Sequence, residues 1–201
     1  MDEHYYRAAH HEDRWIYNKL EVSLRAGWVC GPCGEPVPQD GEYIIRPVMN
    51  MWGMGREARA CRLKAGDVQD KPGYFWCLRG EDDYQLSVDY ARYHGQWRPI
   101  LVVRGDKDRA APMYRFSRWT KLDLSEAIAA PAFLSSLRHD GTINVEYVDE
   151  KPIEVHLRHN PDFQHGEEVC IPVWSQEDFE WSFRPDEEYG RAGFIVGMKR
   201  A

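Results

Sequence analysis

The chain has 201 residues, the length of one domain or of two small ones, and its 43% hydrophobic and 29% charged residues are typical of a folded protein. The formal net charge of −7 argues against general binding to nucleic acids or to anionic membranes. No apolar run approaches the roughly 20 residues that a membrane span needs, and the polar first residues do not resemble a signal peptide.

Hydrophobic periodicity predicts a helix near the N-terminus, over residues 12–26, because Ile16, Leu20 and Leu24 recur there at a spacing of four. A second helix is predicted over residues 127–138. Short apolar segments between turn residues predict strands at 42–48, 73–78, 85–91, 97–105, 143–148, 152–158 and 194–199. Loops are predicted for the Gly- and Pro-rich residues 31–41 and for most of the chain after Asn160. This order of elements indicates an α+β protein with antiparallel sheets.

The acidic charge is concentrated in one part of the chain. Residues 1–139 carry 20 basic and 19 acidic side chains, whereas residues 140–190 carry 3 basic and 14 acidic ones, a net charge of −11. The last eleven residues add three basic side chains. A solvated acidic face is the simplest interpretation of this block. A functional role requires particular carboxylates at structured positions that face a cation.

The five cysteines are an odd number at irregular spacing, which favours a cytoplasmic protein with reduced thiols. Two of them, Cys30 and Cys33, form a Cys-Gly-Pro-Cys motif. A redox dithiol needs a helix to begin at its first cysteine, and the glycines and prolines that follow disfavour one. A structural zinc site needs two more ligands, and Cys61 and Cys77 do not form a second close pair. We favour an incidental pair in a loop over either function.

Two other segments allow a functional and a neutral interpretation. Residues 104–121 carry six basic and two acidic side chains with aromatic residues between them, a pattern that can bind single-stranded nucleic acid. Because the rest of the chain is acidic, we favour a loop that faces a phosphate or an acceptor substrate. The adjacent His10 and His11 could bind a metal, but polar residues near a terminus usually have no such role.

Three segments in chain order have the chemistry that a nucleotide with a metal ion requires. The first two supply cations and glycines. Lys19 lies on the predicted first helix, and Arg46 lies on a predicted strand that is followed by Gly53 and Gly55. Cationic side chains offset phosphate charge, and glycines let backbone N–H groups approach phosphate oxygens. These four residues therefore predict contacts with a polyphosphate.

The third segment is a predicted hairpin with one carboxylate on each strand, Glu146 and Glu154. Glu154, His156 and Arg158 alternate with apolar residues, so one face of the second strand is polar and the other belongs to the core. Oxygen ligands on adjacent strands can hold an Mg²⁺ ion that bridges phosphates. The hairpin therefore predicts a metal site at Glu146 and Glu154, with His156 as a third ligand.

At these residues the sequence resembles the ATP-grasp superfamily, over roughly residues 13–160. The resemblance implies an α+β fold of two small subdomains, each with an antiparallel sheet and helices, and a nucleotide cleft between them. The subdomains would span residues 1–72 and 73–201. Most members of the superfamily join a carboxylate to an amine through an acylphosphate, with ATP and Mg²⁺.

The resemblance also implies a role for each matching residue. Lys19 and Arg46 would hold phosphates under a loop that contains Gly53 and Gly55. The adenine would be lined by Phe75, Trp76, Cys77 and Leu78, and the metal would be held by Glu146, Glu154 and His156. The transferring phosphoryl group would be stabilised by Arg104 and Arg158. Three features depart from the family pattern. Arg46 replaces the usual lysine, His156 replaces the usual asparagine of the Glu-x-Asn-x-Arg motif, and the 18 residues before Lys19 imply a short form without the family's separate N-terminal domain.

The first hypothesis is therefore an ATP- and Mg²⁺-dependent ligase that acts on a small-molecule or peptide acceptor. The alternatives are a nucleotide-binding or partner-binding protein that retained the fold without catalysis, and a structural protein that binds no nucleotide. The sequence favours neither a nucleic-acid nor a membrane partner, and it is compatible with a homodimer.

Overall fold

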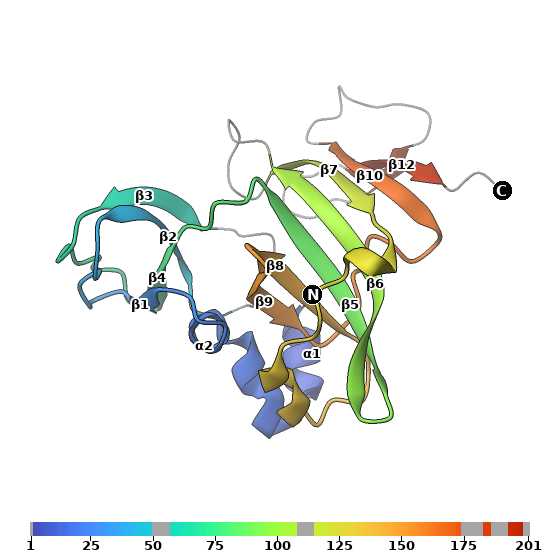
Figure 1. Cartoon of the computed structure of the whole chain (residues 1–201), viewed down its shortest axis with the longest axis horizontal. Helices are drawn as coiled ribbons and strands as arrows, with labels where there is room; N and C mark the ends of the chain where they lie inside the picture. Colours follow the sequence, from blue (N-terminus) through green and yellow to red (C-terminus); the bar gives the residue numbers. More distant parts are fainter. Residues whose placement is uncertain (1, 50–56, 108–114, 174–182, 186–192, 199–201) are drawn as a thin grey trace.

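The computed structural model describes residues 2–49, 57–107, 115–173, 183–185 and 193–198. Its strands form two antiparallel sheets, which Figure 1 shows side by side with helix α2 (Lys19–Arg25) near their junction. This arrangement confirms the predicted α+β class. Among the described residues, none of the helices has the length and apolar character of a membrane span.

The smaller sheet has four strands in the order β1-β4-β2-β3. They are β1 (Cys30–Pro32), β2 (Gly41–Pro47), β3 (Arg59–Leu63) and β4 (Tyr74–Leu78). One face of this sheet packs around Tyr43, Ile45 and Trp76, which are buried with Val37 and Leu63. The predicted loop over residues 31–41 is thus partly wrong, because Cys30–Pro32 forms an edge strand, where glycine and proline are tolerated. Gly31 is required there, since a Cβ atom would lie 2.5 Å from the Trp76 ring.

The larger sheet has eight strands in the order β11-β12-β10-β7-β6-β5-β8-β9. They are β5 (Tyr84–Tyr93), β6 (Gln96–Lys107), β7 (Phe116–Lys121), β8 (Ile143–Val148), β9 (Lys151–His156), β10 (Glu167–Val173), β11 (Phe183–Pro185) and β12 (Gly193–Met198). All seven predicted strands are present. The prediction of mostly loops after Asn160 is wrong, because β10 pairs with both β7 and β12.

The helices near the N-terminus pack on one face of the larger sheet and complete its core. They are α1 (Asp2–Ala8), the 3-10 helix η1 (His11–Tyr17) and α2. Ile16, Tyr17 and Val22 are buried against β5, β8 and β9 residues of this core. The predicted single helix over residues 12–26 is wrong, because Asn18 has an extended backbone and its side chain caps α2 by accepting a hydrogen bond from the Glu21 N–H at 3.0 Å. Leu24, expected on the buried face, is 51% exposed.

The second predicted helix, over residues 127–138, is also wrong. The chain instead forms two short 3-10 helices, η2 (Leu124–Glu126) and η3 (Ala132–Ser136). Pro131 disfavours a helical conformation for the residue before it and lacks a backbone N–H, so an α-helix cannot run through this point. Leu134 and Leu137 still reach the core of the larger sheet.

The crossover between the sheets differs from the predicted boundary at residue 72, because β4 continues the smaller sheet to Leu78. Residues 79–83 form the crossover. The Arg79 N–H donates to the Glu42 carbonyl on the smaller sheet, whereas the N–H groups of Glu81 and Asp82 donate to the Asp149 carboxylate at the turn between β8 and β9. Only Gly80 separates these attachments. A boundary at residue 72 would also separate the N-terminal helices from the larger sheet on which they pack.

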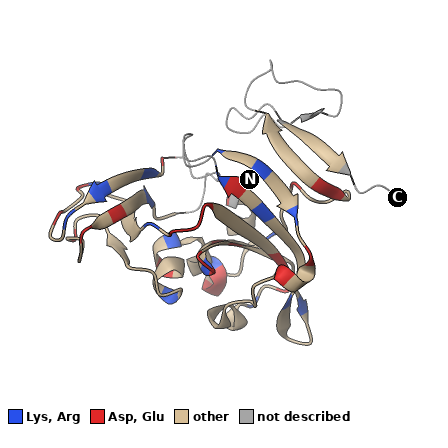
Figure 2. Cartoon of the chain, turned by 45° about the horizontal axis from the view of Figure 1, so that its top comes forward, with Lys and Arg blue, Asp and Glu red and all other residues tan. Residues whose placement is uncertain are grey.

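Figure 2 shows acidic and basic residues on both sheets. Of the 14 acidic residues between positions 140 and 190, six lie outside the described residues, namely Glu177, Asp178, Glu180, Asp186, Glu187 and Glu188. The acidic block is therefore only partly described. Within its described part, Glu154 and Glu167 are buried, so a solvated face does not account for all of the block.

Candidate functional site

The larger sheet carries polar side chains on the face opposite the helices. In β5, Gln85, Ser87 and Asp89 alternate with the core residues Leu86, Val88 and Tyr90. Strand register places Ser87 beside Glu146 on β8 and Glu146 beside Glu154 on β9. Residues opposite each other on neighbouring strands share a face, so these side chains form one continuous polar surface.

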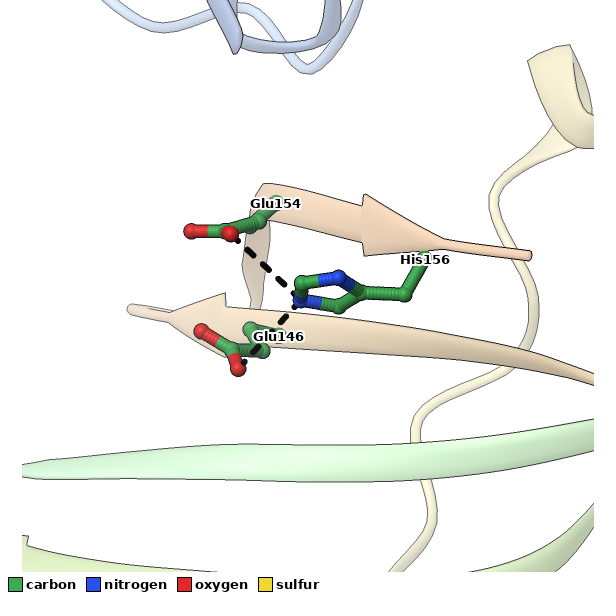
Figure 3. A group of neighbouring side chains, drawn as sticks. All are labelled: Glu146, Glu154 and His156. Carbon is green, nitrogen blue, oxygen red and sulfur yellow. Dashed lines mark ion pairs between the residues drawn. The ribbon is translucent and has the colours of Figure 1, made fainter. Parts of the chain in front are cut away.

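Glu146, Glu154 and His156 meet on this face, as the hairpin pattern predicts (Figure 3). His156 Nε2 lies 3.4 Å from a Glu154 oxygen and 3.7 Å from a Glu146 oxygen. One potential ligand atom from each residue lies within 4.8 Å of the others. Glu154 and His156 are buried, whereas Glu146 is a quarter exposed.

Lys19 completes this group from α2. Its Nζ lies 3.0 Å from Glu154 Oε2, and less than a tenth of either side chain is exposed. Burial raises the pKa of Glu154, but the nearby positive charge of Lys19, with those of His156 and Arg46, outweighs it and holds the pKa below its usual value. Glu154 is therefore an ionised carboxylate inside the protein, with one oxygen facing Lys19 and the other facing His156.

The group offers donors that suit a divalent cation. The two carboxylates are hard oxygen ligands, which Mg²⁺ and Mn²⁺ both accept, and the imidazole of His156 is a better ligand for Mn²⁺ than for Mg²⁺. Gln85 Nε2 donates a 2.7 Å hydrogen bond to Glu146 Oε2, which orients this carboxylate and leaves its other oxygen toward His156. The residues therefore fit a divalent cation that has an affinity for nitrogen as well as oxygen ligands.

Arg46 connects the two sheets. Its Nη2 donates 3.1 Å hydrogen bonds to Ser23 Oγ on α2 and to the Ile153 carbonyl on β9. The guanidinium lies over the Phe75 ring, 4.9 Å from its centre. Arg46 Nε is buried and has no hydrogen-bond partner among the described residues. This unpaired N–H of a cationic group, near Glu154, can donate a hydrogen bond to an anionic ligand.

The four residues expected to line an adenine lie on β4, an inner strand of the smaller sheet. Phe75 and Cys77 pair with Arg46 and Ile44 and face the same way as Arg46. Trp76 and Leu78 face the core of the smaller sheet on the opposite side. Strand alternation therefore leaves only Phe75 and Cys77 directed to the side where α2 and β9 lie.

The remaining sequence-derived candidates are placed differently from one another. Gly53 and Gly55 lie outside the described residues. Arg104 is not brought to the group: it pairs with Leu86, which has its side chain on the helix-covered face, and it forms a 2.8 Å ion pair with Asp106. Arg158 follows β9 and lies near Asp89, where its charge lowers the pKa of this carboxyl against the larger effect of burial, which raises it.

Sequence reasoning missed a buried polar cluster beside the group. Asp89 accepts hydrogen bonds of 2.9 Å from the Asn160 N–H at both carboxylate oxygens and one of 2.8 Å from Asn144 Nδ2. Ser87 Oγ accepts hydrogen bonds from the side-chain amides of the same two asparagines. The cluster holds the segment after β9, and with it Arg158, against the polar face. The alternation of Gln85, Ser87 and Asp89 was the available signal.

Replacing Asp89 with Ala should lower the free energy of unfolding by about 3 kcal/mol, because the half-buried Asn160 N–H and the buried Asn144 amide lose their acceptor. Urea unfolding followed by tryptophan fluorescence measures this loss. Asp140→Ala, which removes a carboxylate that is 95% exposed, is the matched control and should change stability by less than about 0.5 kcal/mol. Equal stabilities of the two variants would contradict the role given to the cluster.

Comparison with known proteins bears on the fold. No protein-family model matches the sequence, and no curated protein sequence matches it. Among solved structures, a protein described as an ATP-grasp superfamily member from Archaeoglobus fulgidus superposes with a TM-score of 0.55 at 16% identity, covering 92% of this chain and 64% of that one. The chain has the ATP-grasp fold.

A second solved structure supports the same ATP-grasp fold. N5-carboxyaminoimidazole synthetase from Staphylococcus aureus, complexed with ADP, superposes with a TM-score of 0.55 at 8% identity, covering 94% of this chain and 69% of that one. The chain spans about two thirds of the length of both proteins. At these identities the comparisons establish the ATP-grasp fold, as the sequence resemblance implies, and not an activity.

Proposed function

We propose that this protein binds ATP with a divalent cation between its two sheets and uses it to activate a carboxylate. The observation that carries the proposal is the group of Lys19, Glu154, His156 and Glu146, of which the first three are buried, with the unpaired Arg46 Nε nearby. Burying this many charges is costly, and a protein retains such a group chiefly where it binds charged ligands. The ATP-grasp fold agrees with this proposal.

The charged side chains have separate roles in the proposed site. Arg46 Nε donates to a phosphate oxygen, and its contacts with Ser23 and Ile153 hold the guanidinium in place. Lys19 adds a second positive charge to the proposed site, next to Glu154. A divalent cation held by Glu146, Glu154 and His156 would neutralise phosphate charge as the phosphoryl group transfers.

The proposed reaction has two steps. An oxygen of the substrate carboxylate attacks the γ-phosphorus of ATP. The bond between this phosphorus and the β,γ-bridging oxygen breaks, so that ADP leaves and an acylphosphate forms. An amine of the acceptor then attacks the acyl carbon, the bond from this carbon to the phosphate oxygen breaks, and inorganic phosphate leaves with the proton that the amine loses as the amide forms. Arg158, held at the end of β9, is the residue that we place near the transferring phosphoryl group.

Two measurements test the proposal in order. ATP with Mg²⁺ or Mn²⁺ should raise the melting temperature by several degrees, because a ligand that binds only the folded state stabilises it. ADP release with pooled carboxylates and amines then tests turnover. A melting temperature unchanged by nucleotide at millimolar concentration would overturn the proposed site.

A non-catalytic nucleotide-binding protein is the second candidate function. The observation that favours it is the position of Arg104, which the resemblance assigns to phosphoryl transfer but which lies on the opposite face of the sheet from Glu146. A nucleotide-dependent rise in melting temperature without ADP release over the pooled substrates would support this candidate.

Replacing His156 with Asn should change which metal the nucleotide-bound protein prefers. The amide oxygen of asparagine is a harder ligand than imidazole, so the ratio of Mn²⁺ to Mg²⁺ affinity should fall several-fold. Calorimetric titration of each ion in the presence of ATP measures this ratio without catalysis. His159→Asn, at an exposed position outside the group, is the matched control. An unchanged ratio in His156→Asn would exclude His156 as a ligand.

A further inference from the structure

The smaller sheet brings together two cysteines that are far apart in sequence. Cys30 on the edge strand β1 lies directly opposite Cys77 on β4. On one side of this pair the Leu78 N–H donates to the Val29 carbonyl at 2.8 Å, and on the other side the Cys33 N–H donates to the Tyr74 carbonyl at 2.9 Å. This alternation makes Cys30 and Cys77 a non-hydrogen-bonded pair of an antiparallel ladder.

Such a pair has the spacing that a disulfide needs. The Cα atoms of a non-hydrogen-bonded pair are about 4.5 Å apart, and disulfides span about 4.4–6.8 Å between Cα atoms. Both side chains lie on one face of the sheet, and a hydrogen bond between the two thiols shifts both of their pKa values. The backbone therefore already has the spacing of a cross-strand disulfide.

The two cysteines of the Cys-Gly-Pro-Cys motif, Cys30 and Cys33, are not the pair that the fold brings together. Cys30 lies on the same face of the sheet as Cys77, whereas Cys33 lies in the turn after β1 with its side chain against the core of the smaller sheet. Cys33 packs with Cys61 against the core of the smaller sheet. Cys77 instead shares its face with Arg46 and Phe75, the side of the candidate nucleotide site.

The surroundings of the pair favour a thiolate on Cys77. The hydrogen bond donated by Cys30 lowers the pKa of Cys77, and the positive charges of Arg46 and Lys151 lower it further against the opposing effect of burial. The same hydrogen bond, together with burial, raises the pKa of Cys30. Cys77 is thus the first nucleophile of the pair and Cys30 the second.

We propose that Cys30 and Cys77 are a modification site that closes to a reversible cross-strand disulfide when hydrogen peroxide is the oxidant. The Cys77 thiolate attacks one peroxide oxygen, the O–O bond breaks, and the departing hydroxide takes a proton to become water. Cys77 is then a sulfenic acid. Cys30 loses its proton and attacks the Cys77 sulfur, the S–O bond breaks, and a second water leaves. Two thiols and one peroxide thus give one disulfide and two waters.

Accessibility agrees with this oxidant. Cys77 is 5% exposed and Cys30 is half-buried at the sheet edge, so a molecule of nearly the size of water can reach the pair more readily than a bulky disulfide. Closure joins residues 30 and 77 covalently and ties the edge strand to β4. The bond restricts the unfolded chain over the intervening residues, which stabilises the fold.

The test begins with the full-length reduced protein exposed to hydrogen peroxide. Free thiols are then blocked, and the protein is digested for peptide mapping by mass spectrometry. We expect a peptide linked through Cys30 and Cys77, two fewer titratable thiols than the five of the reduced chain, and reversal by dithiothreitol. The oxidised protein should melt about 5 °C or more above the reduced one.

Matched variants separate this pair from the other thiols. Cys30→Ser should abolish the linked peptide and the rise in melting temperature, whereas Cys33→Ser and Cys61→Ser should retain both. Mapping on the unmodified protein keeps the test independent of how well any variant folds. A Cys30–Cys33 link, a Cys33–Cys61 link, or conversion of Cys77 to sulfinic acid without a link would overturn the proposal. An oxidised protein that melts no higher than the reduced one would overturn the stabilising role.

Discussion

Glu154→Gln should abolish the rise in melting temperature that ATP with Mg²⁺ or Mn²⁺ gives the unmodified protein. The amide keeps the shape of the side chain but removes the charge that faces both Lys19 and His156. It also leaves Lys19, only 6% exposed, without its ion-pair partner, so the free energy of unfolding should fall by about 3 kcal/mol. Thermal melts with and without nucleotide, and urea unfolding, measure the two effects.

Two controls separate folding from binding for this variant. The double variant Lys19→Met with Glu154→Gln removes both buried charges, so it should recover stability without recovering the response to nucleotide. Glu168→Gln removes a carboxylate from a half-exposed ion pair with Lys121 and should leave both quantities nearly unchanged. A full nucleotide response in Glu154→Gln would exclude Glu154 from the site.

The unfolding free energy of the unmodified protein and that of Glu154→Gln should depend differently on pH. Because the pKa of Glu154 lies below its ordinary value of 4.5 in the folded protein, its contribution to stability is complete above pH 4.5 and is lost as the pH falls through the folded-state pKa. The unfolding free energy of the unmodified protein should therefore decline on acidification below about pH 4.5, and less steeply in Glu154→Gln. Parallel pH profiles would contradict an ionised Glu154.

Arg46→Ala should weaken ATP binding about 10- to 100-fold, because a charge-assisted hydrogen bond contributes about 1.5–3 kcal/mol. The unfolding free energy should also fall by about 2 kcal/mol, since the fully buried Ser23 hydroxyl and the Ile153 carbonyl lose their donor. Isothermal titration calorimetry and urea unfolding measure these changes.

The conservative replacement Arg46→Lys tests the geometry of the guanidinium separately from its charge. An ammonium keeps the positive charge but cannot donate to Ser23, to Ile153 and to a phosphate in the directions that the planar fork allows, so affinity should lie between those of the unmodified protein and Arg46→Ala. Arg59→Ala, on the neighbouring strand with an exposed contact to Gln69, is the control. ATP affinity unchanged in Arg46→Ala would show that the guanidinium does not contact the nucleotide.

Local pattern was enough to predict the hairpin but not the placement of residues that depend on strand register. Glu154 and His156 alternate with core residues, and a short turn puts Glu146 on the adjacent strand, so their proximity follows from sequence. Whether Arg104 faces the same side depends on its pairing with Leu86, a contact between strands that no local pattern encodes. The partner of Cys30 is likewise set by the pairing of β1 with β4.

Helices were predicted less well than strands, for a related reason. Spacing of apolar residues suggested one continuous helix through Asn18, but the capping preference of this residue outweighed the periodicity. Tertiary contacts then bury Tyr17 and leave Leu24 exposed, whereas Ile16 and Val22 are buried as the periodicity predicts. The overall α+β class was unaffected, because it depends on the kinds of element and their order.

The crossover attachment has a mechanical consequence. Since residue 79 is bound to one sheet and residues 81 and 82 to the other, a rigid-body rotation between the sheets would have Gly80 as its pivot. Two hydrogen bonds to neighbouring carbonyls of β9, from the Trp28 indole to Pro152 and from Arg46 to Ile153, would resist such a rotation. A Cβ at Gly80 would lie 2.6 Å from Asp149, so a larger residue there would strain the pivot itself.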